Sequence, residues 1–241
     1  MYDLSQFLKD CEDLDVALNE KQQKQFMDYY DLLVEWNSFM NLTSITEFEE
    51  VCKKHFVDSL SIIKALPDID KEEYHIIDIG TGAGFPGLPL KIAFPQLKIT
   101  LLDSLQKRVK FLNEVIEKLE LSDIDTIHGR AEDFAKPDKL REKYDICVSR
   151  AVANLSTLSE LCLPFIKVDG MFISYKSEKI AEEAIGAQKA IDILGGKVKR
   201  QVDFKLPDSD MYRNLFIIEK VKNTPKKYPR KAGLPAKEPL K

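Results

Sequence analysis

Cysteine and histidine are scarce in this chain of 241 residues, which contains four Cys and three His. No two cysteines form a Cys-x-x-Cys pair and the histidines are scattered, so we predict no metal site. No apolar run reaches the roughly 18–20 residues that a membrane-spanning helix needs. The N-terminus is acidic from its start, unlike a secretory signal or transit peptide. We therefore expect a cytoplasmic protein without membrane contact, whose thiols are reduced and buried.

The charge is distributed unevenly along the sequence. Residues 1–60 carry 13 acidic and five basic side chains, a net charge of −8, whereas the whole chain has a net charge of −4. Residues 220–241 carry eight basic residues and one acidic residue, together with four prolines that oppose regular secondary structure. Two interpretations of the basic, proline-rich tail (222–241) remain open. It is either a solvated, partly disordered terminus or an arm that contacts phosphates, with Tyr228 available for stacking.

Residues 1–70 are predicted to form a helical N-terminal extension. Asn19 is placed to cap a helix from Glu20 to about Asn37, whose aromatic residues recur every three or four positions and are expected to be core. Thr46-Glu47-Phe48-Glu49 has the form of a capping box for a second helix, which ends before Pro67.

Residues 71–221 alternate between predicted strands and helices, which indicates an α/β domain with a mostly parallel sheet. The expected strands are 75–79, 98–102, 124–127, 144–148, 171–175, 197–204 and 214–219. The expected helices are 86–94, 106–119, 157–166 and 180–194.

A glycine-rich turn, Asp78-Ile79-Gly80-Thr81-Gly82-Ala83-Gly84-Phe85-Pro86-Gly87, follows the first of these strands. Ligands of open α/β sheets bind at this edge, and an acid 19 residues after Gly84, Asp103, suits a ribose diol. The Gly-x-Gly-x-x-Gly spacing matches a dinucleotide-binding loop. The longer Asp-x-Gly-x-Gly-x-Gly pattern resembles the S-adenosylmethionine (SAM) loop of class I methyltransferases, and we favour this second interpretation because it explains more residues.

The resemblance extends beyond the turn. The segments DIGTGAGFPGLPLKI, LLDSLQKRVKFL, GRAEDF and VSRAVA follow one another in the order seen in the bacterial 16S rRNA guanine-N7 methyltransferase family, also called RsmG or GidB. The segment NLTSIT…HFVDSL is similar to the N-terminal signature of that family. This resemblance covers about residues 20–220. It implies a Rossmann-like, doubly wound class I SAM-dependent methyltransferase with a helical N-terminal extension and an antiparallel last strand.

The resemblance also implies a reaction and a site. SAM would be the cosubstrate, N7 of a guanine in the 530 loop of 16S rRNA the acceptor, and the small ribosomal subunit the partner of a monomeric enzyme. No catalytic residue is certain. The substrate-orienting candidates are Arg150, Lys107 and Arg130, and Lys176 occupies a further basic position. The expected cosubstrate-binding residues are Asp78, Gly80, Gly82, Gly84, Phe85, Asp103, Ser104, Ala131, Glu132 and Arg150.

The residues around the fourth strand agree with this acceptor. Methylation of an exocyclic amine usually requires an Asp/Asn-Pro-Pro-aromatic turn, but residues 148–152 read Val-Ser-Arg-Ala-Val. Guanine N7 carries an in-plane lone pair and no proton, so positioning alone can support methyl transfer. Two alternatives stay open, namely a non-catalytic RNA-binding ribosome-assembly factor and a SAM-dependent enzyme that acts on a small molecule.

Overall fold

The protein is built around one seven-stranded sheet with the strand order β3-β2-β1-β4-β5-β7-β6. A computed structural model describes residues 2–150, 153–177 and 180–240. The strands are β1 (His75–Ile79), β2 (Lys98–Asp103), β3 (Ile124–His128), β4 (Tyr144–Arg150), β5 (Ile166–Lys176), β6 (Gly196–Lys205) and β7 (Tyr212–Lys220). The first five strands pair in parallel, whereas β7 pairs antiparallel with both β5 and β6. The expected doubly wound sheet and its antiparallel last strand are confirmed.

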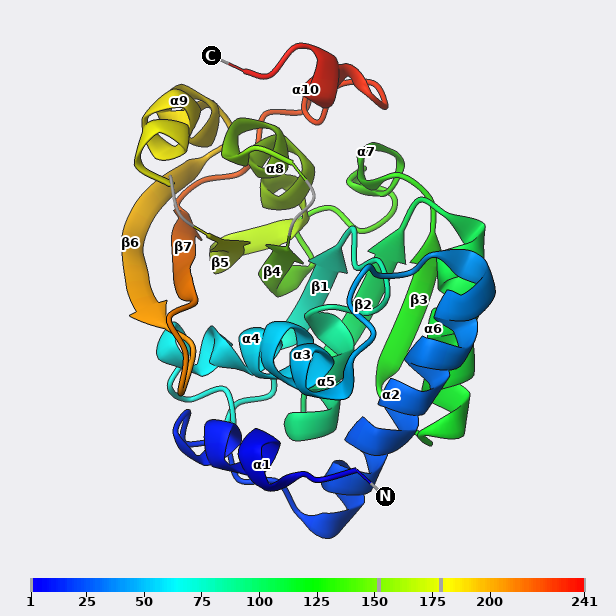
Figure 1. Cartoon of the computed structure of the whole chain (residues 1–241). Helices are drawn as coiled ribbons and strands as arrows, with labels where there is room; N and C mark the ends of the chain where they lie inside the picture. The colour runs from blue at the N-terminus through cyan, green and yellow to red at the C-terminus, as the bar shows by residue number, and fades with distance from the viewer. Residues whose placement is uncertain (1, 151–152, 178–179, 241) are drawn as a thin grey trace.

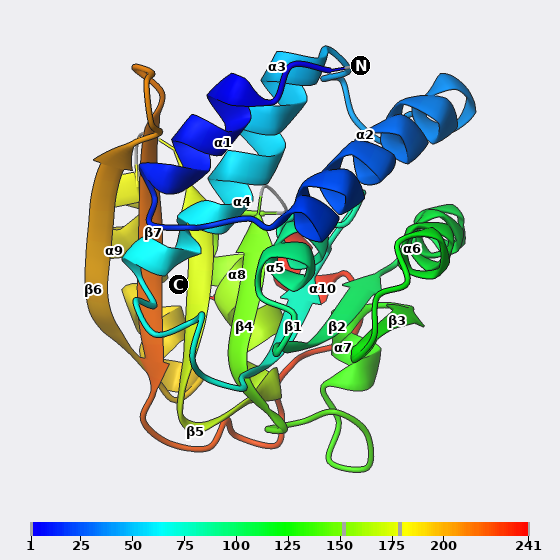
Figure 2. The same cartoon turned by 90° about the horizontal axis from the view of Figure 1, so that it is seen from below.

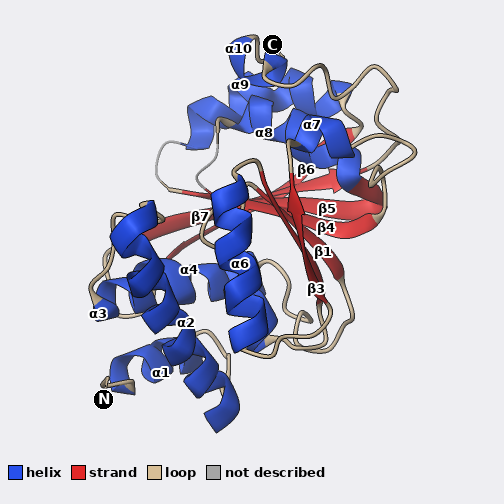
Figure 3. Ribbon diagram, turned by 90° about the vertical axis from the view of Figure 1, so that its right-hand side faces the viewer, coloured by secondary structure: helices blue, strands red, loops and turns tan. Residues whose placement is uncertain are grey.

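Helices cover both faces of the sheet (Figures 1 and 3). One face carries α7 (Ala131–Phe134), α8 (Leu155–Cys162), α9 (Ile180–Ile193) and the short C-terminal α10 (Leu234–Lys237). The other face carries α5 (Gly87–Ala93), α6 (Gln106–Lys118) and the N-terminal helices. Each face has its own cluster of buried apolar side chains, and the N-terminal helices share theirs with the sheet. Because helices cover both faces of the sheet, side chains on both sides of a strand are buried. This explains the near-continuous apolar strands in the sequence.

The N-terminal extension forms a layer of helices over one face of the sheet (Figure 2). It comprises α1 (Ser5–Glu12), α2 (Glu20–Met40), α3 (Phe48–Val51), the π-helical turn η1 (Cys52–Val57), α4 (Asp58–Leu60) and the 3₁₀ turn η2 (Ser61–Lys64). Asn19 caps α2, as predicted, and the capping box is complete. The Asn19 side chain accepts a hydrogen bond from the Gln22 backbone amide, and the Gln22 side chain accepts one from the Asn19 backbone amide.

The predicted capping box at Thr46 is wrong. α3 begins one residue later than that box requires, with Glu47 at the cap position and no side-chain bond to the helix. The Tyr30 hydroxyl donates to the Thr46 carbonyl at 2.8 Å, and Phe48 packs edge-on against the Tyr30 ring. These tertiary contacts decide where the helix starts.

The predicted helix 157–166 is also displaced. The structure has α8 over Leu155–Cys162, a 3₁₀ turn η3 over Leu163–Phe165, and β5 from Ile166 onward. Pro164 has no amide hydrogen to continue the α-helical bonding, so the chain tightens into the 3₁₀ turn and then extends. β5 is consequently longer than the five residues that the sequence indicates.

Strand order places a topological switch point between β1 and β4. β1 is followed by β2 on one side, and the chain returns to β4 on the other side after β3. The loops at the carboxyl ends of these strands therefore diverge, which leaves room for a ligand between them. Among the described helices, none is long and apolar enough to cross a membrane.

Candidate cosubstrate and acceptor site

Asp78 fixes the glycine turn that follows β1. This carboxylate is fully buried, and its Oδ2 accepts from the Thr81 hydroxyl at 2.7 Å and the Gly87 amide at 2.9 Å. Burial raises the pKa of Asp78 to about 6, against the opposing effect of these two bonds. Asp78 reaches both ends of the turn and thus sets its shape.

The N-terminal layer also contacts this turn. The Tyr29 hydroxyl of α2 donates to the Ala83 carbonyl, and the Tyr29 ring lies 5.5 Å from that of Phe85. Gly84, at φ +100°, lies so close to this layer that a Cβ atom would come within 2.8 Å of the Tyr29 hydroxyl. Helix α2 therefore supports the glycine turn, although it precedes the sheet in the sequence.

Asp103 lies at the carboxyl end of β2 and faces the turn. Its carboxylate accepts from the amides of Gly82 and Leu105, each at 2.9 Å, and from the Arg108 guanidinium at 3.3 Å. Gly82 adopts φ +63°, a left-handed conformation that directs its amide to Asp103. The carboxylate is 2% exposed and borders the cavity beside Gly80, which suits it to hold ribose hydroxyls.

Two adjoining cavities follow the turn and share Gly80 and Ser104. The first, of about 410 Å³, is polar and carries Asp103, Arg108, Arg150 and His55 on its walls. The second, of about 240 Å³, is bordered mainly by apolar groups, among them Ile79, Leu102, Ala131, Leu161 and Pro235. We call them, after the parts of SAM that the sequence leads us to expect there, the methionine compartment and the adenine compartment. Together they match an elongated ligand with one charged end and one flat apolar end.

A third cavity, of about 420 Å³, lies beyond His55 and Arg150, which also border the methionine compartment. We call it the acceptor cavity. Its lining comes mainly from the N-terminal layer, β4, β5 and β7. Five of its residues are charged, namely Lys54, Asp58, Arg150, Lys176 and Arg213.

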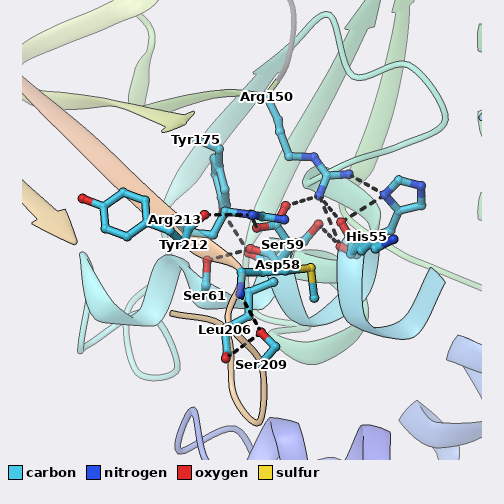
Figure 4. A network of polar contacts seen from close by, with 12 residues as sticks. His55, Asp58, Ser59, Ser61, Arg150, Tyr175, Leu206, Ser209, Tyr212 and Arg213 are labelled. Carbon is cyan, nitrogen blue, oxygen red and sulfur yellow. Dashed lines mark hydrogen bonds and ion pairs between the residues drawn. The ribbon is translucent and has the colours of Figure 1, made fainter. Parts of the chain in front are cut away.

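Asp58 organises the charges of the acceptor cavity. Figure 4 shows the guanidinium groups of Arg150 and Arg213 converging on this carboxylate, each with a nitrogen 2.7 Å from one of its oxygens. Arg150 also lies 5.0 Å from the centre of the Phe85 ring and donates to the Lys54 carbonyl at 3.2 Å. Arg150 is thus fixed in the wall between the methionine compartment and the acceptor cavity.

His55 occupies the same wall and stacks on Phe85 with 4.5 Å between the ring centres. Its Nε2 lies 3.0 Å from the Thr43 hydroxyl. Burial, followed by the positive charge of Arg150, lowers the pKa of His55 to about 4. The imidazole is therefore neutral at physiological pH and does not add a third positive charge beside the two guanidinium groups.

The structure brings most of the residues expected from the sequence to these cavities. Gly80, Gly82, Phe85, Asp103 and Arg150 border the methionine compartment. Ser104 is shared, Arg130, Ala131 and Glu132 border the adenine compartment, and Lys176 borders the acceptor cavity.

Three expected residues lie elsewhere. Asp78 and Gly84 are buried beneath the turn and border none of the three cavities, so they act on its shape. Lys107 donates to the Met40 carbonyl at 3.0 Å, at the C-terminal end of α2. It joins α6 to the N-terminal layer, as a cation at a helix C-terminus commonly does.

The basic tail is packed against the sheet domain, contrary to a partly disordered terminus. Tyr228 is 8% exposed and therefore not available for stacking on a base. The Arg141 guanidinium donates to the Tyr228 carbonyl at 2.7 Å, and the tail forms the one-turn helix α10 despite its prolines. Residues 233–236 reach the adenine compartment, a placement that the sequence does not reveal.

Sequence reasoning missed two further polar members of the site. Asp58 belongs to the HFVDSL segment, but nothing in its spacing shows that it pairs with arginines 92 and 155 residues away. Arg213 lies just before the last strand that the sequence predicts, where an isolated arginine is usually a surface residue, but in the structure it is the second residue of β7. The four cysteines are buried and unpaired, as expected, and the described residues contain no cluster that could hold a metal ion.

Comparison with known proteins shows the family to which this chain belongs. The family model for "rRNA small subunit methyltransferase G" (GidB) matches residues 22–212. The chain is 56% identical over 240 residues to the Ribosomal RNA small subunit methyltransferase G of Lachnoclostridium phytofermentans, covering 100% of this chain and 98% of that protein. The protein of the same name from Alkaliphilus metalliredigens is 54% identical over 235 residues, covering 97% and 98%. The chain belongs to the rRNA small subunit methyltransferase G family.

Solved structures agree with the fold of this methyltransferase G family member. A SAM-dependent methyltransferase from Aquifex aeolicus superposes with a TM-score of 0.54 at 17% identity, covering 75% of this chain and 97% of that chain. The M. jannaschii TYW2 structure in complex with AdoMet gives a TM-score of 0.52 at 18% identity, covering 68% and 77%. The fold is that of class I SAM-dependent methyltransferases, and the expected fold class is confirmed.

Proposed function

We propose that this protein transfers a methyl group from SAM to N7 of a guanine in the 530 loop of 16S rRNA. Membership of the methyltransferase G family supports the reaction class and the RNA. The observation that carries the proposal is the shared wall of His55 and Arg150, which separates the methionine compartment from the acceptor cavity and its cations. A sulfonium methyl at that wall would face an acceptor entering from the other side.

The acceptor cavity fits a nucleotide. Arg150, Arg213 and Lys176 supply positive charge for a phosphate or for acceptor atoms of a base. Because Asp58 pairs with both arginines, it offsets part of that charge. A guanine that gains positive charge on methylation therefore meets a less repulsive field than two unpaired guanidinium groups would create. This supports orientation of the base as the role of Arg150.

The polar groups here suit a reaction that needs no proton abstraction. Both oxygens of Asp58 are already engaged by guanidinium groups, and the pKa of His55 is lowered to about 4, so the imidazole is a weak base. The buried Tyr175 hydroxyl donates to the Ser59 carbonyl, and burial raises its pKa well above 10. Alignment for in-line displacement is worth roughly 7–11 kcal/mol in favourable cases, which these fixed groups can supply.

We further propose that the protein acts as a monomer in the cytoplasm, where the small subunit is assembled. Sedimentation at enzymatic concentrations tests this, and activity confined to a dimer would overturn it.

Methyl-tritiated SAM should be incubated with the protein and small subunits that lack the modification, and the RNA then treated with borohydride and aniline, which cleave at 7-methylguanine. Label with one cleavage in the 530 loop is expected. The exposed Asp133→Ala variant should behave like the unaltered protein, whereas Asp103→Ala should leave the RNA unlabelled.

Other outcomes separate the alternatives. Label without cleavage would retain the methyltransferase and reject N7. Turnover of SAM with a small molecule and no label in RNA would favour a small-molecule enzyme. Binding of SAM and of subunits without any transfer would favour a non-catalytic assembly factor.

A further inference from the structure

The end of the chain crosses the sheet domain and returns to the cosubstrate cleft. After β7 it passes Arg141, whose guanidinium binds the carbonyls of Thr224 and Tyr228. It then lies over α8, where Figure 1 shows α10 beside α8 and α7. We call residues 228–240 the C-terminal hook.

A buried ion pair attaches the C-terminal hook to α8. Glu160 is 1% exposed, and its Oε1 accepts from the Arg230 amide at 2.8 Å and from Arg230 Nε at 2.9 Å. Its Oε2 lies 2.7 Å from Arg230 Nη2. A carboxylate this deeply buried is tolerated only because the guanidinium and the backbone amide satisfy it. The hook is therefore held at a defined position and does not merely lie on the surface.

Two hydrogen bonds then set the hook at the edge of the adenine compartment. The Gly233 amide donates to Glu132 Oε1 at 2.8 Å, and the Thr157 hydroxyl donates to the Pro235 carbonyl at 3.1 Å. Gly233, Pro235 and Ala236 line this compartment together with Ile79 and Leu102. The end of the chain thus encloses a space that strands β1 to β3 leave open.

We propose that the C-terminal hook is a cosubstrate-binding element, whose Pro235 and Ala236 pack on the adenine of SAM and of S-adenosylhomocysteine (SAH). A flat nucleobase needs apolar contacts on its faces, and Leu102 and Ala131 line the same compartment as Pro235 and Ala236. Glu132 acts on adenine binding by positioning Gly233, since one of its oxygens is used by that amide. The inference rests on SAM as cosubstrate but not on which nucleotide is methylated.

Two alanines of the hook provide a matched test. Ala232 and Ala236 are both exposed, but only Ala236 borders the adenine compartment. Ala236→Trp would place an indole in a cavity of about 240 Å³ without disturbing the core, whereas Ala232→Trp would point the same group elsewhere. The affinity of each full-length variant for SAH and for 5′-methylthioadenosine, which lacks the amino-acid end, is measured by calorimetry without RNA.

Ala236→Trp is expected to raise both dissociation constants at least tenfold, and Ala232→Trp to leave them within twofold. A tenfold tightening by Ala236→Trp would equally place residue 236 against the adenine. Unchanged affinity in both variants would overturn the proposal.

Hydrogen exchange on the unaltered protein gives a second measurement. Peptides covering residues 228–240 should exchange more slowly with SAH bound, and unchanged exchange there would contradict the contact. Both readouts use SAH without RNA, so failure of the rRNA reaction would not be confused with failure of this inference.

Discussion

The acceptor cavity and the adenine compartment lie at the same edge of the sheet but are built from opposite ends of the chain. The acceptor cavity is completed by the N-terminal layer and is strongly charged, with Asp58 between two arginines. The adenine compartment is completed by the C-terminal hook and is mostly apolar. The parallel sheet supplies the edge that both share, while the segments outside it determine the chemistry of each side.

The difference follows from what each cavity is proposed to hold. A nucleotide in a large RNA brings phosphates and a polar base edge, so it requires fixed cations. An adenine brings two flat faces, so it requires apolar walls. Asp58, Arg150 and Arg213 of the acceptor side pair with one another, which keeps them in place before the substrate arrives. The following variants test whether the two sides are independent.

The largest effect is expected at Asp103, which borders the methionine compartment between the two sides. Asp103→Ala removes the carboxylate that fixes the Gly82 amide and is placed for the ribose hydroxyls. Hydrogen bonds to a charged group contribute about 1.5–3 kcal/mol each, so the dissociation constant for SAH should rise about 10³-fold. Calorimetry measures this, with Asp133→Ala as an exposed control. A change of less than threefold would remove Asp103 from the binding site.

Next in size is the attachment of the C-terminal hook. Arg230→Ala leaves Glu160 buried without its charge partner, which should cost about 3 kcal/mol of unfolding free energy. For a chain of this length the melting temperature should fall by about 6–12 °C.

Lys205→Ala, which removes an exposed pair with Asp210, should cost less than about 1 kcal/mol. Equal melting temperatures for Arg230→Ala and Lys205→Ala would show that the hook does not contribute to the stability of this domain.

Arg150→Ala should affect the acceptor side more than the cosubstrate side, although Arg150 borders both cavities. Arg213 remains to pair with Asp58, so the cavity keeps one of its two guanidinium groups. Methyl transfer to small subunits should fall about thirtyfold, or about 2 kcal/mol, while SAH binding stays within threefold.

Arg150→Lys should recover only part of the lost activity, because lysine cannot reproduce the planar guanidinium. If SAH binding fell by the same factor as transfer, Arg150 would belong to the cosubstrate side.

The smallest effect is expected for His55 and depends on pH. Its pKa is about 4 in the folded protein and 6.5 otherwise, so the unfolded chain binds the proton first. The contribution of His55 to stability is fully present above pH 6.5 and is lost as the pH falls toward 4. The free energy of unfolding that is lost between pH 6.5 and pH 5 should therefore be about 1 kcal/mol smaller for His55→Gln than for the unaltered protein.

Asp78 acts in the opposite direction. Its pKa is raised to about 6, so its contribution is lost as the pH rises from 3.8 to 6. The comparison of His55→Gln with the unaltered protein cancels this effect, since Asp78 is present in both. His75→Gln, at an exposed position, serves as the control, and parallel melting curves for all three proteins would reject the role assigned to His55.

Local sequence determined the parts of the molecule whose causes lie within a few residues. Strand β1 appears with the predicted bounds, and the Asn19 cap and the glycine turn lie where the pattern indicates. Asp103 is recognisable because strand length and the acid at its end are both local features. Failures occur where a distant group intervenes, as when Tyr30 and Phe48 shift the start of α3.

Only the tertiary structure decided which residues share a cavity. Asp58 meets Arg213 across 155 positions because β7 inserts antiparallel between β5 and β6, an order that no local pattern encodes. Arg230 meets Glu160 across 70 positions because the chain after β7 returns over α8. The sequence shows that the tail is basic. It does not show whether a basic residue of the tail contacts RNA or stabilises the fold, because that depends on a buried partner that is distant in the sequence.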